Sequence, residues 1–343
     1  MMRLVPLFAL FLLGCPPTLS RPSPRYEADL AAAERAAAHG RDGEAAALFA
    51  TAAESADRRV DRDEARYRRA RALEDEGRID EALAELEAIA TTTPPSRRTA
   101  RALFDAAKLR IRHDGDRARA DAELRRVVLE FSEHGVASRA LHWMLRERDA
   151  SGQLALIDEL DPLVGETELG DNLLMRRTEI LLERQERQAA RATLEKLVER
   201  HPYPFGEYWD EAVLMLAELD VEDGDVDGAI ARLEAMLERS EDTNLSGSYT
   251  LPNFPVAHLR IAELHRQRGR SGEAARWYSS LAGRYPTCRL RDDALLGLAT
   301  LRFDEGDDEA ACETLSELVE EFEVGHARRE GQALRETRCA NSR

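Results

Sequence analysis

Apolar residues recur along the chain at helical spacing, in paired segments that are joined by the same kind of turn. In the first pair, Gly40 is followed five residues later by Ala45 and four residues after that by Phe49. The glycine lets the chain leave the first helix with a left-handed backbone angle, and the small alanine lets the second helix approach the first closely. The bulky residue continues an apolar stripe with a period of 3.6 residues. Each occurrence therefore predicts a helix, a short turn and a second helix.

The motif recurs at a nearly constant interval. Its turn positions are Gly40, Gly77, Gly115, Gly224, Gly269 and Gly306, with Gln185 in place of glycine in a further copy. The steps are 37, 38, 39, 45 and 37 residues, apart from a gap of 70 residues between Gly115 and Gln185. This gap predicts one degenerate unit at about 136–165 that turns near 150–152. Such a period is typical of repeat arrays. The predicted fold is therefore all-α, a right-handed α-solenoid of about eight helix pairs over residues 26–323.

The repeat resembles the tetratricopeptide repeat. Pro202 and Pro286 stand where that family has the proline that ends the second helix. The segment 284–299 is similar to repeats in periplasmic assembly lipoproteins of the BamD kind and in TolA-binding periplasmic proteins. The resemblance implies a non-catalytic scaffold for protein–protein interaction that needs no cofactor. Leu30 and Glu34 occupy the places of the Lys and Asn that read C-terminal carboxylates in some members, so that activity is not implied.

Three further features interrupt or end the array. Residues 242–255 fall within the 45-residue step and predict a surface loop. Residues 326–338 predict a last helix that covers the open end, within a capping helix and tail at 324–343. Cys312 and Cys339 would lie at nearly the same level on the last two helices, so their spacing allows a disulfide. Unpaired thiols are the alternative.

The first residues predict targeting rather than fold. Residues 1–14 combine a short positive start with an apolar run at 4–13 that is too short to span a bilayer, which indicates a signal peptide. The run ends in Leu-Leu-Gly-Cys at Cys15, which resembles the bacterial lipobox and implies a lipid on that cysteine. An ordinary signal peptide is the alternative. The prolines that follow predict an extended tether over residues 15–25. We therefore expect a lipid-anchored protein of the bacterial cell envelope, and the absence of Asp at Pro16 favours the outer membrane, facing the periplasm.

The charge of the chain and the motifs it lacks argue against two classes of function, nucleic-acid binding and catalysis. The chain has a formal net charge of −17, and the acidic excess lies almost wholly after residue 150. A phosphate backbone would be repelled there, which argues against nucleic-acid binding. No nucleophile elbow, phosphate loop or Cys-x-x-Cys occurs in the sequence, and its histidines do not cluster. We therefore predict no enzymatic activity.

The first helix of each pair lines the binding groove in tetratricopeptide arrays, and counting back from each turn gives the residues expected there. They are Tyr67, Arg71, Arg112, His113, Glu179, Glu183, Glu211, Glu218, Glu222, Glu263, Phe303 and Asp304. The predicted groove is basic early and acidic from the middle onward. An acidic groove favours partner proteins or peptides with basic segments, although a solvated helix face is the alternative.

One segment of the sequence fits both a metal-binding motif and the repeat turn. Asp223, Asp225, Asp227 and Glu234 satisfy the spacing of a calcium-binding loop. The same residues are in register as a repeat turn, and a twelve-residue calcium loop would force the two helices apart. We therefore interpret them as a turn. The leading hypothesis is a lipid-anchored scaffold that binds other envelope proteins. A calcium-regulated binding module and an accessory subunit of a cell-envelope enzyme are the alternatives.

Overall fold

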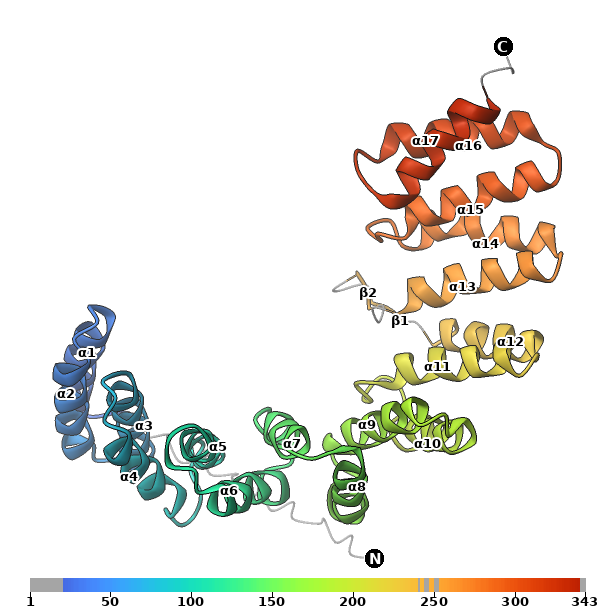
Figure 1. Ribbon diagram of the computed structural model, residues 1–343. Helices are drawn as coiled ribbons and strands as arrows, with labels where there is room; N and C mark the ends of the chain where they lie inside the picture. The colour runs from blue at the N-terminus through green and yellow to red at the C-terminus, as the bar shows by residue number, and fades with distance from the viewer. Residues whose placement is uncertain (1–20, 240, 244–246, 250–252, 340–343) are drawn as a thin grey trace, which may run out of the picture. The chain divides into compact units, whose positions relative to one another are not determined.

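The computed structural model describes residues 21–239, 241–243, 247–249 and 253–339, which form helices joined by short turns and one two-stranded hairpin (Figure 1). The helical repeat fold predicted from the sequence is confirmed. The chain divides between Met144 and Leu145 into two compact units, called unit 1 and unit 2 below. Among the described residues, no helix combines the length and the apolar character needed to cross a bilayer. The predicted signal peptide, Cys15 and the first part of the tether lie outside the described residues.

Unit 1 is built from antiparallel helix pairs in which each helix from α1 to α5 packs on the next. Its helices are α1 (Pro24–Ala38), α2 (Asp42–Ser55), α3 (Arg59–Asp75), α4 (Ile79–Ala90), α5 (Thr99–Leu109), α6 (Arg117–Glu130) and most of α7 (Ala137–Arg146). A π-helical turn, η1 (Arg110–Asp114), follows α5. The motif alanines Ala45, Ala82 and Ala120 are fully buried, as close helix approach requires.

Unit 2 continues the same arrangement. Its helices are α8 (Ala150–Val164), α9 (Leu169–Glu183), α10 (Arg187–Arg200), α11 (Trp209–Glu222), α12 (Val226–Leu237), α13 (Phe254–Gln267), α14 (Ser271–Arg284), α15 (Arg291–Asp304), α16 (Asp308–Glu321) and α17 (His326–Arg338). The motif positions Ala229, Leu233, Ala274 and Tyr278 lie in one continuous core. Below, the first helix of a pair is an A helix and the second is a B helix.

The degenerate unit and the insertion differ in detail from the sequence predictions. The helices α7 and α8 are separated by residues 147–149, slightly before the predicted turn, because Asp149 caps α8 by accepting from the amide of Gly152. The insertion contains a short antiparallel hairpin, β1 (Glu241–Thr243) and β2 (Gly247–Tyr249), rather than only a loop. Three-residue strands are too short to show an alternating pattern in sequence.

The tether prediction was too long at its C-terminal end. Helix α1 begins at Pro24, within the segment predicted to be extended. Ser23 is its N-cap and accepts from the amide of Tyr26 at 3.3 Å. Proline is well suited to the first helical position, where no amide hydrogen is needed. The segment predicted to be extended is therefore helical from Pro24 onward.

The predicted capping helix and its link are both present in unit 2. Helix α17 packs on α15 and α16, and a disulfide joins Cys312 of α16 to Cys339 at the end of α17, with a Cα–Cα distance of 5.7 Å. Gly331 of α17 lies so close to α16 that a Cβ there would meet Leu318 Cδ2 at 2.5 Å. The cap therefore contacts the last repeat both covalently and through tight packing.

The turns have the left-handed backbone that the motif predicts, including the turn without glycine. The φ angle of Gln185 is 63°, in the range of the turn glycines such as Gly40 at 67° and Gly269 at 69°. A side chain in this conformation costs about 1 kcal/mol or more, a cost that glycine does not incur.

Replacing Gln185 with glycine is therefore expected to stabilise unit 2 by about 1 kcal/mol. Chemical denaturation monitored by circular dichroism measures this change. Gln185→Ala is the matched control, because it keeps the backbone cost while removing the same side chain. Equal stability of the glycine and alanine variants would contradict the prediction.

Candidate functional site

Ion pairs link successive A helices of unit 2 across a polar, solvent-exposed face. Arg260 of α13 donates to Glu218 of α11 through Nε at 2.7 Å and Nη2 at 2.8 Å. The same guanidinium donates to Glu263 at 3.0 Å. Arg266 of α13 lies 3.9 Å from Asp304 of α15. The charge of Glu218 is therefore compensated within the protein. The predicted groove is less uniformly negative than its sequence indicates.

Exposed carboxylates also lie between α9 and α11. Glu211 of α11 reaches solvent and has no ion pair among the described residues, whereas the exposed Glu179 of α9 pairs with Arg176 of its own helix at 2.5 Å. Partial desolvation by its neighbours, then the nearby carboxylates of Asp210 and Glu179, raise the pKa of Glu211. We call Glu179, Tyr208 and Glu211 the acidic face of unit 2.

The same carboxylates affect the pKa of the Tyr208 phenol. Burial raises the pKa of Tyr208, and four carboxylates add to this shift, including those of Glu211 and Glu179. Glu211 and Glu179 therefore lie close enough to Tyr208 to influence the pKa of its phenol.

The prediction that Phe303 lines the groove is wrong. Its side chain is buried, and the Arg338 guanidinium lies 3.9 Å from the centre of its ring. Arg338 belongs to α17, so the capping helix covers this position. Glu222 is exposed but forms an ion pair with Arg187 of the B helix α10. These contacts depend on tertiary packing and could not be counted from the turn.

Tyr67 is likewise a core residue rather than a groove residue. Its hydroxyl donates to Asp105 Oδ2 at 2.7 Å, and Arg101 Nε donates to the same oxygen at 2.9 Å. The Arg98 guanidinium lies 4.6 Å from the centre of the Tyr67 ring. The phenol is thus engaged in an internal network that joins α3 to α5 in unit 1.

The remaining predicted residues lie on A helices or in their last turns with varied exposure. Arg112, His113, Glu179, Glu183, Glu211, Glu218, Glu222 and Asp304 are exposed, while Arg71 and Glu263 are partly exposed. Arg71 is paired with Glu74 at 2.9 Å. The structure does not gather these residues into one site.

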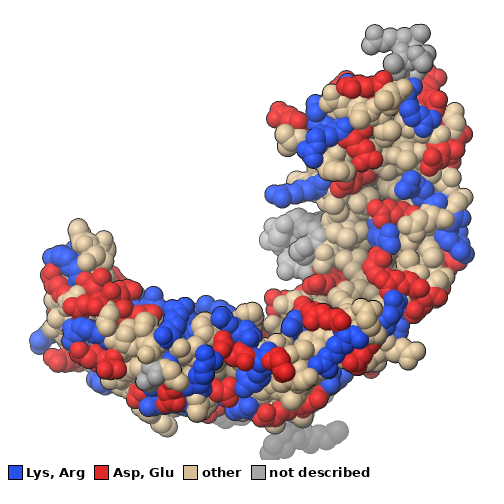
Figure 2. Space-filling view, in the orientation of Figure 1, with Lys and Arg blue, Asp and Glu red and all other residues tan. Residues whose placement is uncertain are grey.

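A group of cations surrounds Phe104 in unit 1, and the sequence pattern did not predict it. Arg101, Lys108 and Arg139 lie 5.8, 5.6 and 5.5 Å from the ring centre of the buried Phe104. Arg139 makes no ion pair within the described ranges. Figure 2 shows both charge signs mixed over the visible face, with Lys and Arg gathered over α5. We call these three cations and Phe104 the basic face of unit 1.

The π-helical turn explains why these residues were missed. Counting back from Gly115 assumes a regular α-helix, but η1 contains about one extra residue per turn. A regular count puts Asp105 in the place that Tyr67 has in the preceding repeat, and the extra residue puts Phe104 there instead. In the same way, the shift brings Lys108 into the place that Arg71 has in the preceding repeat.

Glu64 of α3 holds several arginines of unit 1 together. It is buried and accepts from Arg98 Nε at 2.6 Å and from Arg68 Nε at 2.9 Å. Burial alone would raise the pKa of the Glu64 carboxyl, but the hydrogen bonds from Arg98 and Arg68 outweigh it and lower the pKa to about 2.

This pKa predicts that unit 1 loses stability in acid. Because the folded-state pKa of Glu64 is lowered, its contribution is present above the unfolded pKa of about 4.5 and is lost as the pH falls towards 2. Thermal unfolding measured between pH 6 and pH 2 tests this in the wild type and in Glu64→Gln, at roughly unit intervals. The variant should be less stable at pH 6 and less sensitive to acid, and identical pH profiles would contradict the assignment.

The calcium-like segment folds as a repeat turn. Helix α11 ends at Glu222 and α12 begins at Val226, so most of the twelve-residue motif is helical. Asp225 caps α12 by accepting from the amide of Gly228 at 2.9 Å. Asp227 pairs with Arg270 at 2.6 Å, and Asp223 pairs with Arg191 at 2.8 Å. The carboxylates have different partners, and the part of the chain that the structure describes contains no group of three potential metal ligands.

Tetratricopeptide-repeat family models match residues 173–202, 214–287 and 293–323 of unit 2. The chain carries tetratricopeptide repeats. Such repeats generally mediate protein–protein interaction, and they are typically binding modules rather than catalysts. No curated protein matches the sequence.

Three solved structures are similar at low identity. The crystal structure of YrrB, a TPR protein with an unusual peptide-binding site, is 14% identical, with a TM-score of 0.41, and the match covers 62% of this chain and 98% of YrrB. PilW, a type IV pilus biogenesis factor, is 15% identical, with a TM-score of 0.36 and coverage of 78% and 97%. A tetratricopeptide repeat protein from Parabacteroides merdae is 17% identical, with a TM-score of 0.32 and coverage of 77% and 82%.

Proposed function

We propose that this protein is a lipid-anchored scaffold of the bacterial cell envelope that binds a partner protein through the acidic face of unit 2. The partner presents Lys or Arg side chains to Glu179 and Glu211. The observation that carries this proposal is the uncompensated charge of Glu211, since Glu218 on the same helix already has its own arginine. A basic partner segment would supply the missing positive charge.

The anchor rests on the sequence at Cys15. The apolar run and the Leu-Leu-Gly-Cys order support lipid attachment, and the prolines that follow support a spacer between the membrane and α1. The proposed location is the outer membrane, with the repeats facing the periplasm. A single acyl chain binds membranes only marginally, so the multiple chains of a lipoprotein would be needed for stable anchoring.

Fractionation of cells that express the full chain tests the anchor. The wild type should sediment with membranes and resist extraction by salt, while Cys15→Ser should lose that association. Chemical crosslinking before solubilisation then compares the partners captured by the two forms. If Cys15→Ser fractionates like the wild type, the lipid anchor is refuted.

A further inference from the structure

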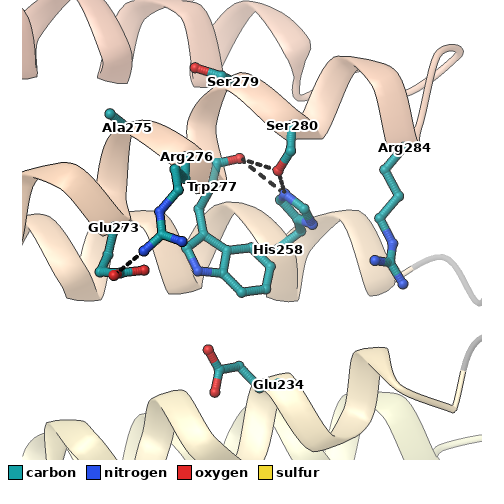
Figure 3. Close-up of a pocket in the computed structure, with 9 residues that line it drawn as sticks. All are labelled: Glu234, His258, Glu273, Ala275, Arg276, Trp277, Ser279, Ser280 and Arg284. Carbon is teal, nitrogen blue, oxygen red and sulfur yellow. Dashed lines mark hydrogen bonds and ion pairs between the residues drawn. The ribbon is translucent and has the colours of Figure 1, made fainter.

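A cavity lies between the B helices α12 and α14 (Figure 3). Its lining includes no residue of the acidic face. Its volume is about 1070 Å³, and α14 forms most of its lining, together with Glu234 of α12 and His258 of α13. The half-buried indole of Trp277 faces this space, and Glu234 points towards it from α12.

Several other aromatic rings of this protein lie next to cations of the same chain. Arg98 covers Tyr67, Arg239 lies 5.5 Å from the Trp209 ring, and Arg291 lies 5.7 Å from the Phe322 ring. Within the described residues, no cation lies over Trp277. Its π-face is therefore an open acceptor for a positive charge at the edge of a cavity.

The charged residues around Trp277 differ in whether they already have a partner within the protein. Arg276 is paired with Glu273, and Arg284 donates to the backbone carbonyl of Leu237 at 3.3 Å. Glu234 has no ion pair among the residues that the structure describes. Glu234 is thus the lining carboxylate that remains to be neutralised, and it stands opposite the indole (Figure 3).

His258 packs against the indole and binds the backbone of the same residue. The His258 Nε2–H donates to the Trp277 carbonyl and to Ser280 Oγ, both at 3.0 Å, and the His258 and Trp277 rings meet edge to face at 4.6 Å. Burial lowers the pKa of His258 to about 4, which leaves this imidazole neutral at physiological pH. A fixed indole loses little conformational freedom when a ligand binds.

We propose that this cavity binds an arginine or lysine side chain from a basic segment of a partner protein. The cation lies over the Trp277 ring and pairs with Glu234, while its aliphatic stem occupies part of the space between α12 and α14. This site is separate from the acidic face, so either site can fail without the other.

The test uses the full chain with nitrogen-15-labelled tryptophan and an acetylated, amidated tetra-arginine peptide. The Trp277 indole signal is assigned by its loss in Trp277→Phe, or in Trp277→Tyr if the first variant does not fold. The peptide should shift this signal saturably, and Glu234→Gln should weaken the apparent affinity about threefold or more. Glu238→Gln, at the exposed C-cap of the same helix, should have no effect.

Two outcomes would overturn the proposal. One is a Trp277 signal that does not shift saturably with the basic peptide, or that shifts equally with tetra-glutamate. The other is an unchanged affinity at this signal in Glu234→Gln. Because the readout is local to Trp277, binding of the same peptide at the acidic face would not produce the expected shift.

Discussion

Replacing both Glu179 and Glu211 with Lys is expected to weaken binding of a basic partner segment about tenfold or more. Each exposed ion pair contributes only about 0.2–1 kcal/mol, but reversal removes two attractions and adds two repulsions. About 1.4 kcal/mol corresponds to a tenfold change in affinity. Glu211 should account for more of the effect than Glu179, which already has Arg176 as a partner.

A matched control separates this face from a general effect of charge. Glu195→Lys with Glu199→Lys makes the same change in net charge at exposed positions of the B helix α10. Binding of the crosslinked partner or of a peptide from it, measured by calorimetry at two salt concentrations, should be nearly unaffected in this control. Equal weakening in both double variants would show that only net charge matters.

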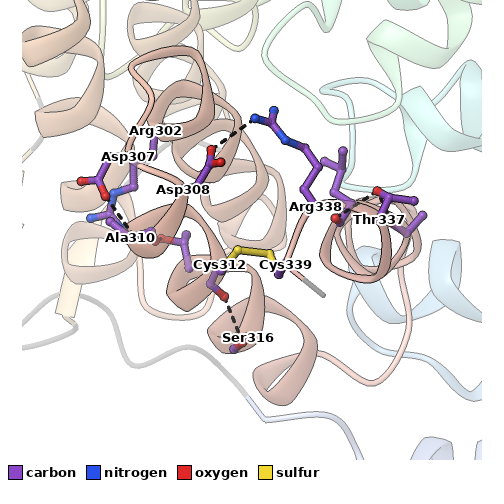
Figure 4. The surroundings of a disulfide bond; sticks show 12 residues. Arg302, Asp307, Asp308, Ala310, Cys312, Ser316, Thr337, Arg338 and Cys339 are labelled. Atoms are coloured by element: carbon purple, nitrogen blue, oxygen red, sulfur yellow. Dashed lines mark hydrogen bonds and ion pairs between the residues drawn. A yellow bond between two sulfur atoms is a disulfide. The ribbon is translucent and has the colours of Figure 1, made fainter. Parts of the chain in front are cut away.

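Breaking the bond between Cys312 and Cys339 is expected to destabilise the capped end of unit 2 by roughly 3 kcal/mol. The bond closes a segment with a sequence separation of 27 residues, so its loss restores conformational entropy to the unfolded cap. Figure 4 shows the surrounding contacts, including Arg338 with Asp308 at 3.2 Å, which is an exposed pair and contributes little. The bond should therefore be the larger contribution.

Hydrogen exchange measures this effect at the cap itself. Amides of α17 should lose protection in Cys312→Ser and in the reduced wild type, whereas amides of unit 1 should not change. Cys288→Ser is the control, because Cys288 is a free cysteine. Unchanged protection of α17 after reduction would contradict a stabilising role.

The repeat fold was predictable because it depends on short-range spacing. The turn, the small alanine and the bulky residue occupy fixed places in each pair, and Gln185 adopts the same left-handed backbone as the glycines. Even the capping helix could be placed at 326–338, since its limits follow from a local apolar pattern and the end of the array.

The candidate site was harder to predict because it depends on contacts between repeats. Counting along one helix cannot show that Arg260 reaches Glu218, or that α17 covers Phe303. It also fails where the helix is irregular, as at η1, whose extra residue moved Phe104 and Lys108 into the basic face of unit 1. A sequence pattern gives the residues of a face, whereas packing decides which charges remain free.

The central claim is that the acidic face of unit 2 holds a partner, and photo-crosslinking in membranes tests it most directly. A photoreactive amino acid is placed at Glu211 in the full chain, with Glu195 on α10 as the comparison position. We expect a discrete crosslinked partner from position 211, attached through a segment rich in Lys or Arg, and little from position 195. A partner crosslinked only from position 195, or a segment from position 211 without basic residues, would contradict it.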